Sequence, residues 1–329
     1  MKLNPEMHLA DLLSPDLKKA ATREGFGAAL VEVGEKDASV VALSSDVMGS
    51  VQMGKFAAKF PDRAFNVGVA EQNLASVAAG LAYAGKTPFI GAFGSFSPGR
   101  NWEQIRTTIC YAEANVKIEG SHTGLDVGED GATHQVLEDI ALMRTLPNML
   151  VLSPCDFEET KKAVYAAWKH VGPVYIRCTR GKVPMFTTAE TPFVVGKMNL
   201  LNDGSDIAII ATGDTVYPSL LAADALEKEG VSVAVAACHT LSDIDAGALS
   251  SLAKKCGSII TVEDHQVKGG LGAAVCEALA DVYPCRVRRH GMKMAFGESG
   301  TGPEVMTKHG LDKGGIINVI KEEMGRKGK

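Results

Sequence analysis

The chain has 329 residues, of which 46% are hydrophobic, and a formal net charge of −5. This length and apolar content can support two domains with buried cores. The small excess of acidic groups does not favour a polyanionic partner, so we expect no binding to nucleic acid.

Strand-like and helix-like segments alternate through the first half of the chain. Apolar runs that predict strands cover residues 39–45, 87–93, 115–120, 149–154 and 173–179. Helical patterns cover residues 16–36, 70–84, 102–113 and 156–170. Continuous apolar strands separated by helices are typical of a parallel sheet covered on both faces. We therefore predict an α/β domain over residues 1–190.

Residues 184–203 interrupt this alternation with paired threonines, a proline and a polar end, LNDGSD. We predict a linker there. The alternation then resumes, with strands expected at 206–212, 231–237, 258–263 and 285–290, and helices at 217–229, 246–255 and from Gly272. This pattern predicts a second, smaller α/β domain over residues 195–329. Only its last nine residues, KEEMGRKGK, are expected to be frayed.

The cysteine pattern indicates a reducing compartment. The seven cysteines include no CxxC pair, and most stand in apolar runs. Buried thiols fit this pattern better than a disulfide framework or a zinc site. The N-terminal residues contain acids and prolines and do not resemble a signal peptide. No apolar run approaches the roughly 20 residues that span a membrane, so we expect a cytoplasmic protein without membrane attachment.

Glu71 stands at the start of the predicted helix 70–84, whose later residues are almost all apolar. A first-turn acid is common because it interacts favourably with the helix dipole. That ordinary interpretation would suffice if Glu71 stood alone. The segments that follow it favour a functional one.

The segment EGSHTGLDVGEDGATHQ, residues 119–135, directly follows a predicted strand. Open α/β sheets bind ligands at the carboxyl ends of their strands, and glycines let the backbone approach a ligand closely. His122 and His134 can serve near neutral pH as an acid, as a base or as a hydrogen-bond donor to phosphate. A solvated surface loop is the alternative. A metal site with Asp126 and Asp130 is another, but the spacing matches no standard ligand pattern, so we expect no metal in this chain.

Two phenylalanines follow the predicted strand 87–93. Phe93 and Phe96 are three residues apart and could stack on a flat heterocycle. Taken alone, such residues more often belong to the core.

Together these segments resemble the second half of the transketolase family. GVAEQ, residues 68–72, is similar to the segment that carries the family's thiamine-activating glutamate, and GEDGATHQ, residues 128–135, is similar to a specific family signature. TREGFG, SSDVMGS, LPNMLVLSPCD, VEDH, GGLGAAV and FGESG follow in family order. The resemblance covers essentially the whole chain. It implies a pyrimidine domain with the thiamine-diphosphate-binding fold, followed by a transketolase C-terminal α/β domain.

The resemblance also implies how the cofactor is held. Glu71 would accept a hydrogen bond from the pyrimidine ring of thiamine diphosphate, and so would act in catalysis as well as in binding. Phe93 and Phe96 would pack on that ring. Asp46 resembles a family acid near the cofactor.

The sugar site follows from the same resemblance. His134 would be a second catalytic residue beside the reacting hydroxyls of the donor sugar, and Asp130 would bind a substrate hydroxyl. The residues that match the family's sugar-phosphate contacts are Arg23, Ser50, His122 and Arg180. Arginine suits phosphate because its fork donates two parallel hydrogen bonds. The plain alternatives are surface ion pairs for the arginines and a helix cap for Ser50.

The family's other half binds the diphosphate and a divalent metal through a GDG motif, and this chain contains no GDG. The resemblance therefore implies a partner, the N-terminal transketolase subunit, which would hold Mg²⁺ or Ca²⁺ in an α2β2 heterotetramer. The expected reaction transfers a two-carbon ketol unit from a ketose phosphate to an aldose phosphate. It could serve the pentose phosphate pathway or a specialised sugar route.

Two alternatives remain open. The beta-type subunit of a 2-oxo-acid dehydrogenase has the same two-domain plan, although a 2-oxo acid has no distal phosphate for the arginines to bind. A structural or regulatory subunit could keep the fold without turnover. The presence of Glu71, His122, Asp130 and His134 argues against that second alternative, but geometry must decide it.

Overall fold

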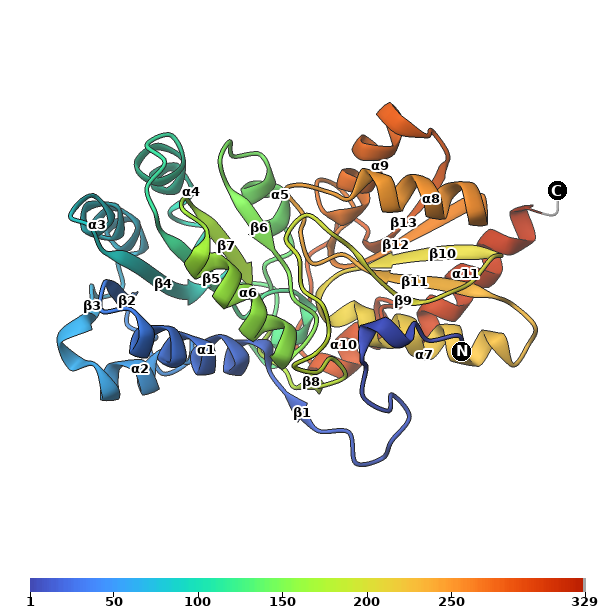
Figure 1. Cartoon of the computed structure of the whole chain (residues 1–329), viewed down its shortest axis with the longest axis horizontal. Helices are drawn as coiled ribbons and strands as arrows, with labels where there is room; N and C mark the ends of the chain where they lie inside the picture. Colours follow the sequence, from blue (N-terminus) through green and yellow to red (C-terminus); the bar gives the residue numbers. More distant parts are fainter. Residues whose placement is uncertain (328–329) are drawn as a thin grey trace.

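A computed structural model describes residues 1–327 of the chain. Figure 1 shows two lobes side by side, each with a central sheet and helices on both faces. The first lobe contains a six-stranded sheet and the second a five-stranded sheet. The predicted fold class, two successive α/β domains, is confirmed.

The first sheet is parallel throughout. Its strands lie in the order β3-β2-β4-β5-β7-β6. Every residue of β2, β5 and β7 is buried, as expected for strands covered on both faces. The bounds of the six strands are β2 (Val40–Ser44), β3 (Ala64–Asn66), β4 (Thr87–Phe93), β5 (Lys117–Ser121), β6 (Leu150–Leu152) and β7 (Val174–Arg177).

Alternate strand residues contact the helices on opposite faces of this sheet. Ala42 of β2 packs with α1 (Thr22–Lys36), α2 (Gly54–Lys59) and α6 (Phe157–Lys169). Its neighbours Val41 and Leu43 face the other side. That side is covered by α3 (Glu71–Tyr83), by α4 (Trp102–Gln104) with the π-helix η3 (Ile105–Cys110), and by α5 (Asp139–Arg144).

The second sheet has the order β13-β12-β10-β11-β9, with β9 antiparallel at its edge. Its strands are β9 (Asn199–Asn202), β10 (Ile207–Ala211), β11 (Val233–Ala237), β12 (Ser258–Gln266) and β13 (Arg286–Met292). One face packs on α7 (Val216–Glu227), α10 (Gly302–Lys308) and α11 (Lys313–Lys327). The other packs on α8 (Ala246–Cys256) and α9 (Leu271–Val282).

Four predictions differ clearly from the structure. The helix predicted from residue 16 begins at Thr22, because β1 (Lys19–Ala20) pairs with β8 (Val183–Pro184). The helix predicted over 102–113 ends at Cys110 in π-helical form. The predicted linker 184–203 contributes a residue to β8 and all of β9, which pairs with β11. The predicted frayed tail continues as α11 to Lys327, and residues 328–329 lie outside the described part.

An apolar cluster joins the two lobes. A single buried cluster includes Ile118 and Tyr175 of the first sheet and Ala208 and Ile210 of the second. The chain's first residues also cross to the second lobe, where the Asn4 amide donates to the Leu201 carbonyl oxygen (3.0 Å) (Figure 1). The second domain is therefore positioned to support loops of the first.

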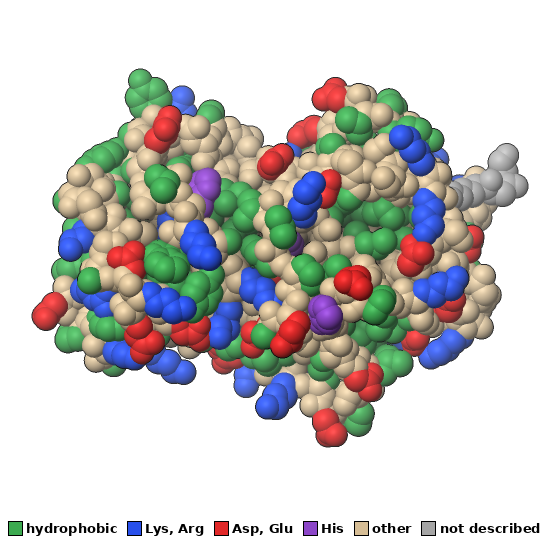
Figure 2. Space-filling model, viewed as in Figure 1, with side chains coloured by type: hydrophobic (Ala, Val, Ile, Leu, Met, Phe, Trp, Pro, Cys, Tyr) green, Lys and Arg blue, Asp and Glu red, His purple; other side chains and the backbone are tan. Residues whose placement is uncertain are grey.

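The visible surface in Figure 2 carries basic and acidic side chains interspersed, with a notch between the lobes. No helix among the described residues is long and apolar enough to cross a membrane. The cysteines form no disulfide within residues 1–327, and five of the seven are buried.

Candidate active site

The predicted residues gather at the carboxyl edge of the first sheet. The chain passes from β2 to β3 on one side and returns to β4 on the other, so β2 and β4 flank a topological switch point. Open α/β sheets bind ligands in the crevice at such a point. Phe93 ends β4, Ser121 ends β5, and Glu71 begins α3 after β3.

Glu71 is only 2% exposed, unlike an ordinary first-turn acid. Its Oε2 lies 2.7 Å from Nη1 of Arg100, and its Oε1 accepts a hydrogen bond from the Ser45 hydroxyl (3.3 Å). Its backbone oxygen accepts from Asn101 Nδ2 (3.0 Å). Burying a carboxylate is costly unless it is paired. The buried carboxylate of Glu71 is therefore paired with the partly exposed guanidinium of Arg100.

Phe93 and Phe96 form a half-buried aromatic pair beside this acid. Their ring centroids are 6.0 Å apart, with 18° between the planes. The guanidinium carbon of Arg100 lies 4.9 Å from the Phe96 centroid. Aromatic faces with a carboxylate at their rim can accept a flat heterocycle that carries an N–H donor.

Both predicted histidines contact the same aromatic pair. The His122 ring stacks on Phe93, with centroids 3.9 Å apart, and the His134 ring meets Phe96 edge-on at 5.5 Å. The two residues are twelve positions apart in the sequence, and the loop between them returns the second histidine to the first. The fold thus places both imidazoles against the aromatic pair.

His122 is held neutral by its surroundings. It is 4% exposed, has a φ of 55°, and its Nδ1 lies 2.9 Å from the Ser121 hydroxyl. Burial lowers the pKa of His122 to about 3, and the charges of Arg23, Arg180 and His134 act in the same direction. A neutral imidazole can still donate one hydrogen bond to an anion.

The charges of the two predicted phosphate-binding arginines, Arg23 and Arg180, both act on His122. Arg23 donates from Nη1 to the backbone oxygen of Ser50 (2.6 Å). Arg180 donates to the Val127 oxygen and pairs with Glu129 at 2.8 Å. These contacts hold the guanidinium groups near the loops of the site. The Arg180 side chain is 36% exposed, whereas Nε of Arg23 is buried and has no hydrogen-bond partner within residues 1–327.

The remaining predicted residues lie on the surrounding loops. Ser50 contacts Arg23 through its backbone oxygen rather than its hydroxyl. Asp46, at a φ of 67°, accepts a hydrogen bond from Asn66 Nδ2 (2.9 Å). Asp130 ends the short helix η4 (Leu125–Asp130). The structure therefore brings both phenylalanines and both histidines into one cluster, and Arg100 links Glu71 to it. Ser50, Asp46 and Asp130 make no hydrogen bond to that cluster within residues 1–327.

Two contacts escaped the sequence analysis. Arg100 stands in the segment FSPGRNW, and nothing in that segment signals its contact with Glu71. Asp264 lies in the VEDH segment of the second domain and accepts the Leu125 amide on both oxygens (3.0 and 2.9 Å). The second domain thus holds the loop that carries His134.

Gln135 strengthens this support from inside the loop. Its Nε2 donates to the backbone oxygens of Leu125 (3.3 Å), Gly128 (3.3 Å) and Glu298 (2.9 Å). Glu298 belongs to the FGESG segment of the second domain. Gln135, which follows His134 in the sequence, therefore links this loop to the second domain.

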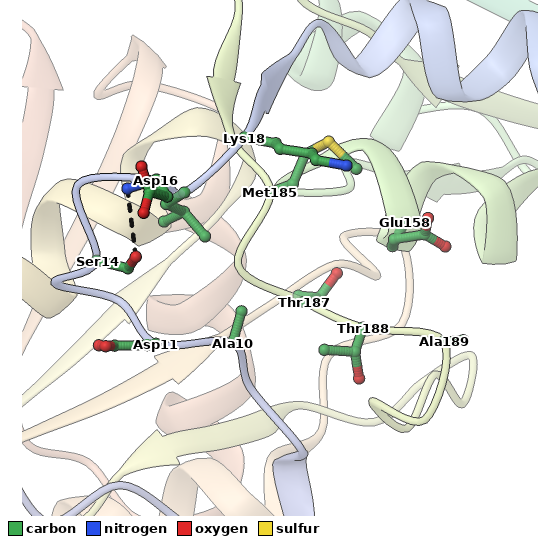
Figure 3. A pocket seen from close by; sticks show the side chains of 11 residues that line it. Ala10, Asp11, Ser14, Asp16, Lys18, Glu158, Met185, Thr187, Thr188 and Ala189 are labelled. Carbon is green, nitrogen blue, oxygen red and sulfur yellow. Dashed lines mark hydrogen bonds between the residues drawn. The ribbon is translucent and has the colours of Figure 1, made fainter.

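No group of three or more histidine, cysteine or acidic side chains is arranged for a metal ion within residues 1–327. A hollow of about 430 Å³ lies elsewhere, between the N-terminal segment and residues 185–189 (Figure 3). Its lining includes Ser14, Lys18, Glu158 and Met185 and none of the predicted site residues.

Comparison with known proteins identifies the family. The family model "Transketolase, pyrimidine binding domain" matches residues 18–185, and "Transketolase, C-terminal domain" matches residues 196–316. A 6-deoxy-6-sulfo-D-fructose transketolase subunit of Clostridium sp. is 37% identical, over 93% of this chain and 95% of that protein. A subunit of the apulose-4-phosphate transketolase of Phocaeicola vulgatus is 38% identical, over 92% of this chain and 97% of that protein.

A solved structure described as a split gene transketolase, inactive beta4 tetramer, superimposes with a TM-score of 0.86. It is 42% identical, and the match covers 93% of this chain and 98% of that one. A match of this extent takes in both domains. The chain therefore belongs to the transketolase family and carries its pyrimidine-binding and C-terminal domains.

Proposed function

We propose that this chain is the C-terminal subunit of a split transketolase. With an N-terminal partner chain it transfers a two-carbon ketol unit from a ketose phosphate to an aldose phosphate, using thiamine diphosphate. The supporting observation is that Phe93, Phe96, His122 and His134 contact one another at the switch point, and that Arg100 links Phe96 to the buried Glu71. A purely structural subunit would not need these side chains to lie together.

The residues present fit the pyrimidine half of the cofactor. Phe93 and Phe96 offer a flat apolar surface, and Glu71 is the buried acceptor at its rim. Thiamine diphosphate, when bound, supplies the nucleophilic thiazolium carbon and the electron sink of the reaction. The role of Glu71 would be to hold a proton at the ring nitrogen of the pyrimidine.

The histidines and arginines would act on the sugar. His134 would exchange protons with the reacting hydroxyls, a task that suits a histidine near neutral pH. His122, Arg23, Ser50 and Arg180 would bind the distal anion, and Asp130 would accept a hydrogen bond from a sugar hydroxyl. Asp46 would stand near the cofactor. These roles are carried from the family motif onto matching positions.

The names of two relatives bear on the substrate. One names a sulfonated ketose and the other a sugar phosphate, and both compounds carry a distal anionic group. The two arginines and the neutral histidine beside them support an anion as the shared chemistry. We propose phosphate, in the pentose phosphate pathway or in a related specialised route.

We infer a partner chain because this sequence does not contain the family's motif for the diphosphate and its metal. The missing motif is GDG, through which the family binds both groups. We propose that an N-terminal transketolase subunit supplies this site with Mg²⁺ or Ca²⁺, in an α2β2 assembly.

The test is to co-express the chain with a GDG-bearing partner and assay ketol transfer. Xylulose 5-phosphate with ribose 5-phosphate should react in the presence of thiamine diphosphate, and pyruvate should not. A complex that assembles and binds the cofactor but transfers no ketol unit from any phosphorylated or sulfonated ketose would refute the proposal. Turnover of pyruvate instead would support the 2-oxo-acid dehydrogenase alternative.

A further inference from the structure

Arg100 makes both contacts that the cofactor's pyrimidine ring would need. Its Nη1 lies 2.7 Å from Glu71 Oε2, and its guanidinium carbon lies 4.9 Å from the Phe96 centroid. A guanidinium is planar, cationic and rich in N–H donors. A pyrimidine that donates an N–H to Glu71 while lying on the phenylalanines is likewise planar, and it would use the same carboxylate and the same aromatic ring.

The free chain needs such a cation. Glu71 is 2% exposed, and its other described side-chain contact is the neutral hydroxyl of Ser45 at 3.3 Å. An ionised carboxylate buried without a charged partner would be strongly unfavourable. Arg100 therefore satisfies Glu71 whenever no cofactor is bound.

The same arginine is free to leave. Its side chain is 50% exposed, so its charge can move into water at small cost. Glu71, by contrast, is fixed at the start of α3, and Asn101 Nδ2 holds its backbone oxygen. Exchange at Glu71 would therefore move the arginine and leave the carboxylate in place.

We propose that Arg100 is a placeholder for the cofactor's pyrimidine ring, which keeps Glu71 paired in the free chain and gives way when the ring binds. This proposal depends on the function proposed above for Glu71. An oxygen that already accepts from a guanidinium cannot accept the ring's N–H in the same direction. The arginine is thus a positioning residue that competes with the cofactor.

Competition has a measurable consequence. If the open arrangement is populated to about one part in ten, the apparent affinity for the ring is about tenfold weaker than its intrinsic value. Removing the competitor removes that penalty. A residue that merely stabilises the fold, or one that contacts the bound cofactor, would not change affinity in this direction.

The experiment measures binding of thiamine to the full chain by saturation-transfer NMR, with Arg100→Gln beside wild type. Thiamine carries the pyrimidine and avoids the diphosphate site expected on the partner. We expect Arg100→Gln to bind thiamine about tenfold more tightly. The matched control is Arg106→Gln, an exposed arginine of η3, which should bind as wild type does. Unchanged or weaker binding by Arg100→Gln would overturn the proposal.

Two further variants separate this proposal from the proposed function. Glu71→Gln should weaken thiamine binding in both backgrounds, and if it does not, the role of Glu71 itself fails. Arg100→Gln should lower the melting temperature because it leaves Glu71 unpaired, and adding Glu71→Gln should restore it. Loss of this rescue would show that the two side chains are not coupled, and would also overturn the placeholder.

Discussion

At the scale of single residues, the burial of Glu71 separates two interpretations that the sequence left together. A solvent-exposed first-turn acid is worth about 0.3–1 kcal/mol through the helix dipole. The observed side chain is buried against Ser45 and Arg100 at the edge of the aromatic pair. Such a position is unfavourable for stability alone and suits a functional acceptor.

Glu71→Gln keeps the size of the side chain but weakens its hold on a proton. In the assembled complex we expect hydrogen exchange at the thiazolium carbon to slow by orders of magnitude, with a melting temperature close to that of wild type. NMR of the bound cofactor measures the exchange. Exchange as fast as in wild type would show that Glu71 is not the activating residue.

His122 is expected to stay neutral in mildly acidic solution. Burial lowers its pKa from 6.5 to about 3, so its imidazole resonances should not titrate between pH 7 and about pH 4. As the pH falls, His122 becomes protonated in the unfolded chain near pH 6.5, well before it does so in the folded chain. The contribution of neutral His122 to stability is therefore complete above pH 6.5 and is lost as the pH falls towards 3. NMR titration checks this, with His122→Asn to assign the signals.

Inorganic phosphate provides a second measurement on the same residue. A bound anion near His122 would favour the charged imidazole and raise its pKa. A phosphate-dependent shift of the titration towards neutral pH would support the anion subsite. An identical titration with and without phosphate would argue against His122 as a phosphate contact.

Arg180 tests the anion subsite through kinetics. Its pair with Glu129 is exposed, and such pairs contribute about 0–1 kcal/mol to stability. A lost charged hydrogen bond to phosphate costs about 1.5–3 kcal/mol. Arg180→Ala should therefore raise KM for phosphorylated sugars by about tenfold or more, with little change in melting temperature. Equal KM values for wild type and variant would remove Arg180 from the site.

At the scale of elements, the loop that carries His134 depends on the second domain. Gly124 has a φ of 77°, and a Cβ there would overlap the carboxylate of Asp264. The backbone conformation and the contact both exclude a larger side chain. The loop can therefore follow its observed path only with glycine at this position.

Gly124→Ala should lower the free energy of unfolding by about 2 kcal/mol or more, since strain and displacement of a buried carboxylate act together. Gly80→Ala is the matched control, because Gly80 lies within α3 and its Cβ would meet nothing within 4 Å. That control should stabilise by about 0.5–1 kcal/mol. Urea unfolding of the isolated chain measures both variants, and equal effects would contradict the docking of the loop on Asp264.

At the scale of the whole molecule, the chain should depend on its partner. We expect the purified chain to have no transketolase activity and to bind thiamine diphosphate poorly, because it contains no GDG motif for the diphosphate and its metal. Calorimetric titration of the cofactor, with and without the partner, measures this. Robust turnover by the chain alone, shown free of any co-purified partner, would contradict the split-enzyme proposal.

The sequence alone determined most of the strands and helices of both lobes. Continuous apolar runs such as residues 87–93 predicted β4 to the residue, because a strand buried on both faces needs apolar side chains in both directions. The motifs around Glu71, Phe93, His122 and His134 also indicated these four residues as candidates for the site. Both signals are local, and local patterns can be read from the chain.

Only the tertiary structure decided the features that depend on distant partners. β9 exists because residues 199–202 pair with β11, and α11 continues because Ile316 and Ile320 are buried and Glu323 pairs with Arg286. The same holds for Arg100, whose sequence context gives no sign that it pairs with Glu71, 29 residues away. Long-range pairing is favourable only after the chain has folded, so neither periodicity nor composition records it.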